Sequence, residues 1–254
     1  MVHTILIEAD KNMKCKHYYR FDDAEYKKLG GEKLDKDGWN TLRLSLDSGS
    51  FALEKEKELY EENCLKEVSY ENMAKAIAKQ LKEYGVKRAC SLGVGKGILE
   101  WHLKRIDPNL CVECTDYTVE TLDILRKVFP SADKYYQFDM MQDSYGKLSI
   151  GTEDVLVVSR LSAEFSKTEW KKIFQRMAEE NVKQVLFVPI GIDNAASMVS
   201  ELLRHYANLV LRKKDTMCGW LYSENEFLAF WRDYYSVKNT LQFDNTKGYF
   251  LTKK

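Results

Sequence analysis

Three alternate glycines stand in a segment that could bind a ligand through its backbone. Gly93, Gly95 and Gly97 follow a hydrophobic stretch that ends at Leu92, and an apolar helical pattern begins at Ile98. Glycine has no Cβ atom, so the chain can turn tightly and a ligand can lie directly against the main chain. The N-terminus of a following helix favours negatively charged groups. The segment therefore predicts a ligand-binding turn between a strand and a helix.

The spacing of these glycines distinguishes two kinds of nucleotide site. A dinucleotide-binding turn has the pattern G-x-G-x-x-G, which would require glycine at position 98, where this chain has Ile98. The third glycine, Gly97, comes one residue earlier. Because a glycine triplet also occurs by chance, the ends of the neighbouring strands have to support the interpretation.

Two aspartates close the next two predicted strands. Asp116 follows Cys114-Thr115, and Asp139 follows Tyr136-Gln-Phe138. An ionised carboxylate has two oxygens, which can accept hydrogen bonds from two ribose hydroxyls at such a strand end. The same residues also suit a helix start and a turn, respectively. Both aspartates are therefore candidate ligand contacts with a structural alternative.

The elements that must position these residues alternate between strand and helix from residue 86 onward. Helical patterns begin at Ile98, after Thr118, at the capping box Ser166–Glu169 and at the capping box Ser223–Glu226. Such alternation predicts an α/β fold with a doubly wound, mostly parallel sheet. Predicted strands are Val86–Leu92, Leu110–Thr115, Tyr135–Phe138, Val155–Ser159 and Gln184–Val188, followed by a terminal hairpin of Val237–Phe243 and Tyr249–Thr252.

The N-terminal third of the chain does not show this alternation. Residues 53–67 are charged and favour a solvated helix, and Ser69 is a candidate cap of a helix that stops at Gly85. We expect residues 1–84 to form a cap or lid segment with helices. Residues 85–254 should form the α/β domain, with an insertion over residues 191–222.

The glycine triplet and the two aspartates together resemble the class I S-adenosylmethionine-dependent methyltransferases. The resemblance covers about residues 85–190 and the closing hairpin. It implies a Rossmann-like seven-stranded sheet and S-adenosyl-L-methionine as cofactor. The family often has an acidic residue two places before the first glycine, where this chain has Ser91. The cofactor contacts that the resemblance implies are Ser91, Gly93, Gly95, Gly97, Asp116, Tyr117, Phe138, Asp139, Met140 and Ser159.

The acceptor side is expected in the segments that the resemblance does not cover. His17 and His205 are candidates for a general base, although a solvated or core histidine explains each of them. Arg160 follows the fourth strand and could pair with an acidic substrate or with surface carboxylates. Aromatic residues suit either an apolar lid or plain core packing. The candidate substrate contacts are Tyr18, Tyr19, Arg160 and Tyr222.

The reaction that these expectations imply is direct, in-line transfer of a methyl group to a small-molecule acceptor. Such transfer requires mainly proximity and alignment, with a base only if the acceptor must lose a proton. The alternatives are a nicotinamide-dependent oxidoreductase, a non-catalytic S-adenosylmethionine-binding module and an aminocarboxypropyl transferase. The sequence leaves the acceptor atom and the oligomeric state open.

Composition narrows the class of protein further. The chain has 39 Lys and Arg against 39 Asp and Glu, so no basic excess points to a nucleic-acid partner. No export signal and no apolar stretch of membrane-spanning length are evident, so the cytoplasm is the expected compartment. Cys111 and Cys114 are spaced as C-x-x-C on a predicted strand, where they face opposite sides, so no metal site is expected.

Overall fold

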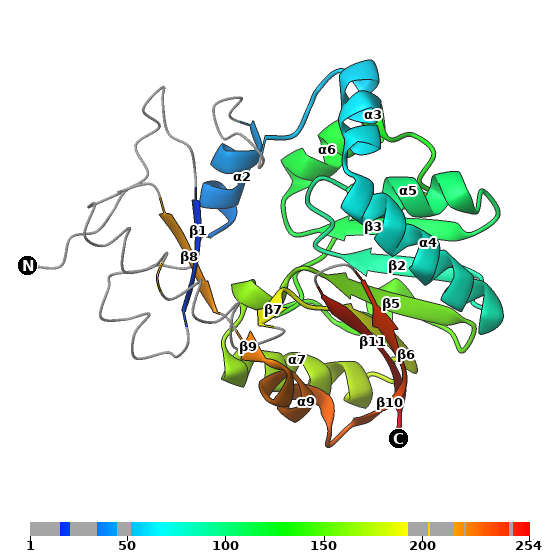
Figure 1. Cartoon of the computed structure of the whole chain (residues 1–254), viewed down its shortest axis with the longest axis vertical. Helices are drawn as coiled ribbons and strands as arrows, with labels where there is room; N and C mark the ends of the chain where they lie inside the picture. Colours follow the sequence, from blue (N-terminus) through cyan, green and yellow to red (C-terminus); the bar gives the residue numbers. More distant parts are fainter. Residues whose placement is uncertain are drawn as a thin grey trace, which may run out of the picture.

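A seven-stranded sheet forms the centre of the molecule (Figure 1). The computed structural model describes residues 16–20, 35–44, 52–192, 203, 216–220, 222–243 and 246–254. The sheet has the order β4-β3-β2-β5-β6-β11-β10, in which the first five strands are parallel and β11 runs antiparallel to both of its neighbours. The strands are β2 (Arg88–Leu92), β3 (Cys111–Asp116), β4 (Lys134–Gln137), β5 (Asp154–Ser159), β6 (Gln184–Val188), β10 (Tyr235–Gln242) and β11 (Lys247–Lys253).

This strand order places a switch point at the middle of the sheet. The chain runs outward from β2 through β3 to β4, and then returns to β5 on the other side of β2. Ligands of open α/β sheets bind outside the carboxyl ends of the strands at such a point. The central strand β5 reads Asp-Val-Leu-Val-Val-Ser, and its four apolar residues are buried, as expected for a strand that is covered on both faces.

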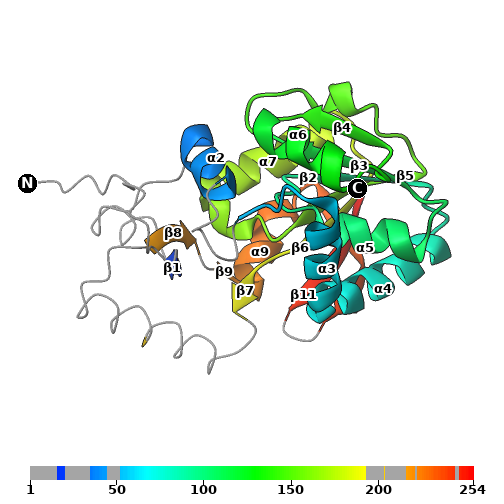
Figure 2. The ribbon, with the colours of Figure 1, turned by 90° about the horizontal axis from the view of Figure 1, so that it is seen from above.

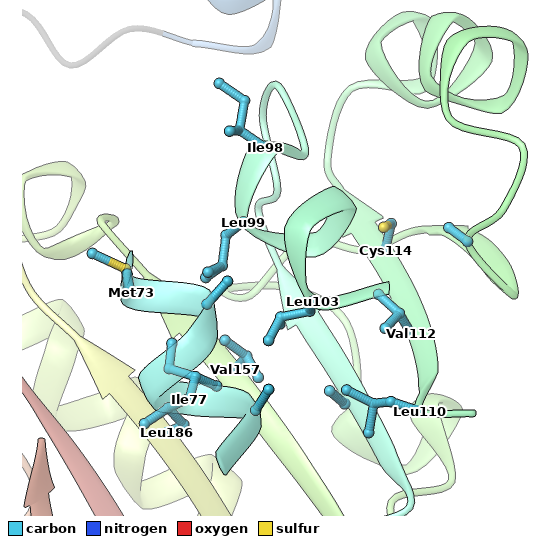
Figure 3. Close-up of a cluster of buried hydrophobic side chains, with 14 of the residues drawn as sticks. Met73, Ile77, Ile98, Leu99, Leu103, Leu110, Val112, Cys114, Val157 and Leu186 are labelled. Atoms are coloured by element: carbon cyan, nitrogen blue, oxygen red, sulfur yellow. The ribbon is translucent and has the colours of Figure 1, made fainter. Parts of the chain in front are cut away.

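Helices cover both faces of the sheet (Figure 2). On one face lie α3 (Lys57–Lys66), α4 (Val68–Glu83), α5 (Ile98–Ile106) and α6 (Val119–Val128). Their apolar residues share one core with Val112, Val157 and Leu186 of the strands; Figure 3 shows Met73 and Ile77 from α4 beside Leu99 and Leu103 from α5. Because α4 is part of this core, the boundary predicted at residue 84 does not separate two cores.

The opposite face is covered by α7 (Lys167–Glu179) and α9 (Glu224–Trp231). Aromatic rings dominate this second core. Trp170 and Phe174 of α7 contact Phe187 of β6 with ring centroids 5.2 and 5.6 Å apart, and Trp231 of α9 lies 5.3 Å from the same ring. The sheet is therefore held between two apolar layers.

The elements predicted from the sequence agree with the structure to within about two residues at most ends. Both predicted capping boxes are present, at Ser166 with Glu169 and at Ser223 with Glu226. Ser69 does not cap its helix, because α4 begins one residue earlier, at Val68, after the N-cap residue Glu67. Two short 3-10 helices, η2 (Tyr145–Leu148) and η3 (Ser162–Glu164), lie in the connections.

The two segments outside the family resemblance meet each other. Strand β1 (Lys16–Arg20) pairs in parallel with β8 (Thr216–Trp220), and β7 (Gly191–Ile192) pairs in parallel with β9 (Tyr222–Ser223). Helix α2 (Lys36–Leu44) contacts α6. Within the ranges given above, no helix has both the length and the apolar character needed to cross a membrane.

Candidate functional site

The glycine turn joins β2 to α5 at the carboxyl edge of the sheet. Gly93, Gly95 and Gly97 have φ angles of +58°, +56° and +66°, a backbone region that residues with a Cβ atom rarely adopt. The turn is held against the end of β3 by a hydrogen bond from Val94 N–H to the carbonyl of Thr115, at 2.9 Å. Gly97 is the N-cap of α5. These three positions therefore favour glycine because of their left-handed backbone conformation.

Asp116, at the end of β3, ties this turn to the next helix. One carboxylate oxygen accepts a hydrogen bond from Gly95 N–H at 3.1 Å. The other accepts from Thr118 N–H at 3.0 Å and from the Thr118 hydroxyl at 2.7 Å. The side chain is 6% exposed. Since a carboxylate offers about four acceptor positions, about one remains for a ligand.

The end of β4 is arranged as a turn. One Asp139 oxygen accepts a hydrogen bond from Met141 N–H at 2.7 Å, which is the turn role that the sequence left open for this residue. Phe138 and Met140 are buried in the second core, with Phe138 5.3 Å from the ring of Tyr145. Tyr117, after β3, donates a hydrogen bond to the carbonyl of Asp35 at 3.1 Å. The cofactor contacts expected of these residues remain predictions.

Glu100 is a buried carboxyl at the base of the glycine turn. It lies in the first turn of α5 and is 3% exposed. Burial raises its pKa from 4.5 to about 7, an effect that the neighbouring Ser91 hydroxyl opposes. Ser91 itself is 1% exposed, and its Oγ atom has no hydrogen-bond partner within the described part of the chain. Two polar side chains thus lie together behind the turn.

Helix α3 holds the glycine turn from outside. The Tyr60 hydroxyl donates a hydrogen bond to the carbonyl of Lys96, at 2.9 Å. The Lys96 ammonium lies 3.5 Å from the carboxylate of Glu54, which in turn accepts a hydrogen bond from the Asn63 amide at 2.7 Å. Because Lys96 lies between two of the glycines, these contacts fix the outer side of the turn.

Arg43 reaches the same turn from α2. A Cβ atom on Gly95 would collide with its guanidinium group. Burial lowers the pKa of Arg43, while the negative charges of Asp116 and Glu164 oppose this effect. The guanidinium also lies 5.2 Å from the centre of the Trp39 ring. A ligand that lies against Gly95 therefore either contacts or displaces this side chain.

The end of β5 lies on the other side of the switch point. Ser159 Oγ is buried and has no hydrogen-bond partner among the described residues. Arg160 is exposed, has a φ angle of +58°, and holds its guanidinium carbon 5.3 Å from the centre of the Tyr70 ring. A left-handed backbone in a residue other than glycine is strained and is frequent at functional sites.

The structure places the remaining candidates differently. Tyr222 is fully buried, packs against Phe227 and Phe230, and donates its hydroxyl hydrogen bond to the carbonyl of Phe165 at 2.8 Å. It is thus packed as a core residue, and the substrate contact expected of it remains a prediction. His205 lies outside the described residues. For His17, Tyr18 and Tyr19 the structure describes only the backbone, in β1.

Three residues at this edge of the sheet, Glu100, Arg43 and Tyr70, were not predicted as site residues from the sequence. Glu100 carried a signal, since it is a charged residue on the apolar side of a helix that contains Ile98, Leu99 and Leu103. Arg43 and Tyr70 carried none, because their positions depend on how the N-terminal helices pack. The structure does bring together the ends of β2, β3 and β5 with Arg43, Tyr70 and Glu100.

The chain is similar to solved structures rather than to known sequences. No protein-family model matches the chain, and no curated protein matches its sequence. Magnesium protoporphyrin IX methyltransferase from Synechocystis PCC 6803, solved with bound SAH, superposes with a TM-score of 0.54 at 12% identity, over 74% of this chain and 84% of that one.

Two further solved structures are similar to this chain. The pyocyanin biosynthetic protein PhzM has a TM-score of 0.59 at 13% identity, over 85% of this chain and 61% of its own. The mitomycin 7-O-methyltransferase MmcR has a TM-score of 0.57 at 16% identity, over 85% of this chain and 60% of its own. The fold predicted from the sequence is confirmed: the chain has the fold of the class I S-adenosylmethionine-dependent methyltransferases.

Proposed function

We propose that this protein is an S-adenosyl-L-methionine-dependent methyltransferase that transfers a methyl group directly to a small-molecule acceptor. The observation that carries the proposal is the glycine turn, which Asp116 ties to the end of β3 at the switch point of the sheet. Several structurally similar proteins are methyltransferases of small molecules, which supports the same class of reaction.

The residues at this edge fit such a cofactor. The side-chain ends of Leu161 and Arg43 occupy the space against Gly93 and Gly95, so a ligand that lies against the turn would displace them. The one remaining acceptor position of Asp116 suits a single ribose hydroxyl, rather than the two expected from the sequence. The buried hydroxyls of Ser91 and Ser159 have no hydrogen-bond partner among the described residues. Because buried polar atoms are usually hydrogen-bonded, these two favour a ligand that supplies the missing hydrogen bonds.

The bound cofactor would supply an electrophilic methyl group on a good leaving group. The work of the protein is then to bind and align the two reactants and to exclude water, which requires no covalent intermediate on the enzyme. Gly95 and Asp116 would hold the cofactor against the turn. A general base enters only for an acceptor that must lose a proton, and His17 and His205 remain predictions for that role.

Arg160 is our proposed contact for the acceptor. It is exposed at the end of β5, and none of the described carboxylates forms an ion pair with it. Its guanidinium carbon lies 5.3 Å from the centre of the Tyr70 ring, and the residue is exposed to solvent. A guanidinium binds carboxylate and phosphate groups through two parallel hydrogen bonds. We therefore propose that the acceptor carries an anionic group.

Ligand binding tests the proposal directly. S-adenosylhomocysteine should bind in a calorimetric titration, and at a concentration of 100 Kd it should add about 2.7 kcal/mol of stability. For a chain of this size that corresponds to a rise in Tm of about 5–11 °C. NAD and NADP should have no effect. Tight NAD binding without a response to S-adenosylhomocysteine would refute the proposal.

The products distinguish methyl transfer from the other uses of the same cofactor. With an accepted substrate, mass spectrometry should detect S-adenosylhomocysteine and a product heavier by one methylene group. Methylthioadenosine as the by-product would instead show transfer of the aminocarboxypropyl arm. Binding without turnover over a broad panel of anionic acceptors would indicate a binding module.

A further inference from the structure

A single helical turn follows strand β4, and no longer helix continues it. The N–H groups of Gln142 and Asp143 donate to the carbonyl of Asp139, at 3.2 and 2.9 Å. Asp139 N–H donates in return to the Asp143 carboxylate, at 2.9 Å. Among the residues that the structure describes, no backbone N–H donates to the carbonyls of Met140, Met141 or Asp143. Carbonyls left over at the end of such a turn need other donors.

Arg176 of α7 supplies those donors. Its Nη1 donates to the carbonyls of Met140 and Met141, at 3.0 and 2.8 Å, and its Nη2 donates to the carbonyl of Asp143. The guanidinium carbon also lies 5.5 Å from the centre of the Tyr145 ring, whose hydroxyl donates to the Met140 carbonyl at 3.2 Å. A guanidinium is planar and rigid, so three carbonyls bound to one such group are held at fixed positions relative to each other.

Helix α7 gives these contacts a rigid support. Phe174 and Met177, on either side of Arg176 in the chain, are fully buried in the second core, whereas the Arg176 side chain is 27% exposed. Because buried side chains hold the helix against the sheet, the core determines where the guanidinium lies, and the guanidinium determines the shape of the turn.

The turn presents the carboxylate of Asp139. One of its oxygens accepts a hydrogen bond from Met141 N–H at 2.7 Å. No group among the described residues donates to the other oxygen. Asp139 is half-buried, whereas Phe138 and Met140 on either side of it are buried. The second oxygen is therefore an acceptor held at the end of β4, and it fits a ligand that brings a donor.

We propose that Arg176 is a positioning residue for the base of the ligand. By binding the three carbonyls, it keeps Met141 N–H on one oxygen of Asp139 and so aims the other oxygen at an amino group of the base. The inference rests on the proposed function for the identity of the ligand, whose adenine carries that amino group. Arg176 acts through the turn and does not touch the ligand. Its planar fork is essential to this role, and a positive charge alone does not replace it.

Two ligands that differ at one group of the base test this inference. S-adenosylhomocysteine carries the amino group, and S-inosylhomocysteine has an oxo group in its place. In calorimetry the wild type should bind S-adenosylhomocysteine about tenfold more tightly or better, the difference of one charge-assisted hydrogen bond. Arg176→Lys keeps the charge without the fork, and the two affinities should then lie within about threefold of each other. Arg176→Gln is a second variant, of which we expect the same loss.

Glu180, near the end of the same helix, provides the matched control. Its carboxylate accepts hydrogen bonds from the Ser144 hydroxyl and from Gly146 N–H, at 3.2 Å for the latter. It therefore holds the same connection at the start of η2, beyond the turn itself. Glu180→Gln should lower the melting temperature but leave the ratio of the two affinities within about twofold of the wild-type ratio. A ratio that falls as far as in Arg176→Lys would show general loosening of the connection and overturn the role of Arg176.

Hydrogen exchange follows the turn without any ligand. The amide of Met141 should exchange about tenfold faster or more in Arg176→Lys than in the wild type, while the amides of β5 exchange as before. An unchanged rate at Met141 would show that Arg176 does not hold the turn, and the inference would fail.

A double substitution tests whether Arg176 acts through Asp139. Asp139→Asn should bring the ratio of affinities close to one, because an amide can turn either its oxygen or its NH₂ group toward the base. Adding Arg176→Lys to this variant should then change the ratio by no more than about twofold, and a larger change would overturn the route through Asp139. A ratio close to one in the wild type would also overturn the inference and leave the cofactor site standing. Failure of both ligands to bind any of the proteins would instead overturn the proposed function.

Discussion

The stability of the ligand-free protein should depend on the protonation of Glu100. Its pKa rises from 4.5 in an exposed state to about 7 in the fold because the carboxyl is buried without a charged partner. At about 1.4 kcal/mol for each pH unit, this difference corresponds to about 3 kcal/mol. Between these two pKa values the folded chain holds a proton that the unfolded chain has lost, so unfolding becomes easier as pH rises.

Replacing the carboxyl by an amide should remove this dependence. Glu100→Gln should match the wild type below about pH 4.5, and it should exceed the wild type by about 3 kcal/mol above pH 7. In a chain of this size that difference raises Tm by about 6–12 °C. The assay is thermal and denaturant unfolding of both proteins between pH 4 and pH 8. A difference that stays constant across this range would refute the view that Glu100 is buried and unpaired.

A second buried glutamate provides the matched control. Glu113 of β3 is fully buried but lies 3.3 Å from Arg88 and 3.3 Å from Lys134. The same substitution, Glu113→Gln, removes the carboxylate partner of Lys134 and one of the two carboxylates that contact Arg88, the other being Asp154. It should lower the stability at pH 7 by about 1–3 kcal/mol. Opposite signs for the same chemical change would show that pairing, rather than burial alone, determines the effect.

Three further substitutions test the site. Asp116→Ala leaves Gly95 N–H and Thr118 N–H without their acceptor, so it should lower stability by about 2–4 kcal/mol and weaken S-adenosylhomocysteine binding at least about tenfold in calorimetry; unchanged values would make Asp116 incidental. Gly95→Ala should cost about 1–2 kcal/mol of backbone strain and also weaken ligand binding, because its Cβ takes up space on the face of the turn that the proposed ligand covers, whereas Gly85→Ala, at φ +66° with nothing within 4 Å, should show the strain in its melting curve and bind normally. Arg160→Ala should raise the KM for an anionic acceptor about tenfold or more without altering S-adenosylhomocysteine affinity; a KM that stays constant would place the anion elsewhere.

The sequence predicted best those structural features that depend on residues close together in the chain. The glycine turn and the capping boxes at Ser166 and Ser223 follow from short-range rules of backbone conformation. The alternation of strands and helices was sufficient to predict the sheet, because connections between parallel strands have a fixed hand. These features could be predicted before any packing was known.

The features that the sequence did not reveal depend on long-range packing. Arg43 reaches Gly95 only because α2 lies beside α6, and no local pattern encodes that contact. Tyr222 lies in a segment whose aromatic residues suited a lid, yet its ring packs in an aromatic cluster with Phe227 and Phe230. The sequence located Asp116 at a strand end but did not reveal the three hydrogen bonds that it accepts within the protein. These bonds reduce the number of ligand hydroxyls from which its carboxylate can accept.

The pairing of β1 with β8 has a consequence for the order of folding. It joins Lys16 to Thr216, whereas β2, β3 and β5 pair across much shorter stretches of chain. Closing a longer loop costs more conformational entropy before any contact is gained, so distant pairings form late and open first. The seven-stranded sheet and its glycine turn can therefore assemble before this two-stranded pair. Opening of the pair would then leave the sheet folded, so that separation of β1 from β8 is distinct from unfolding of the seven-stranded sheet.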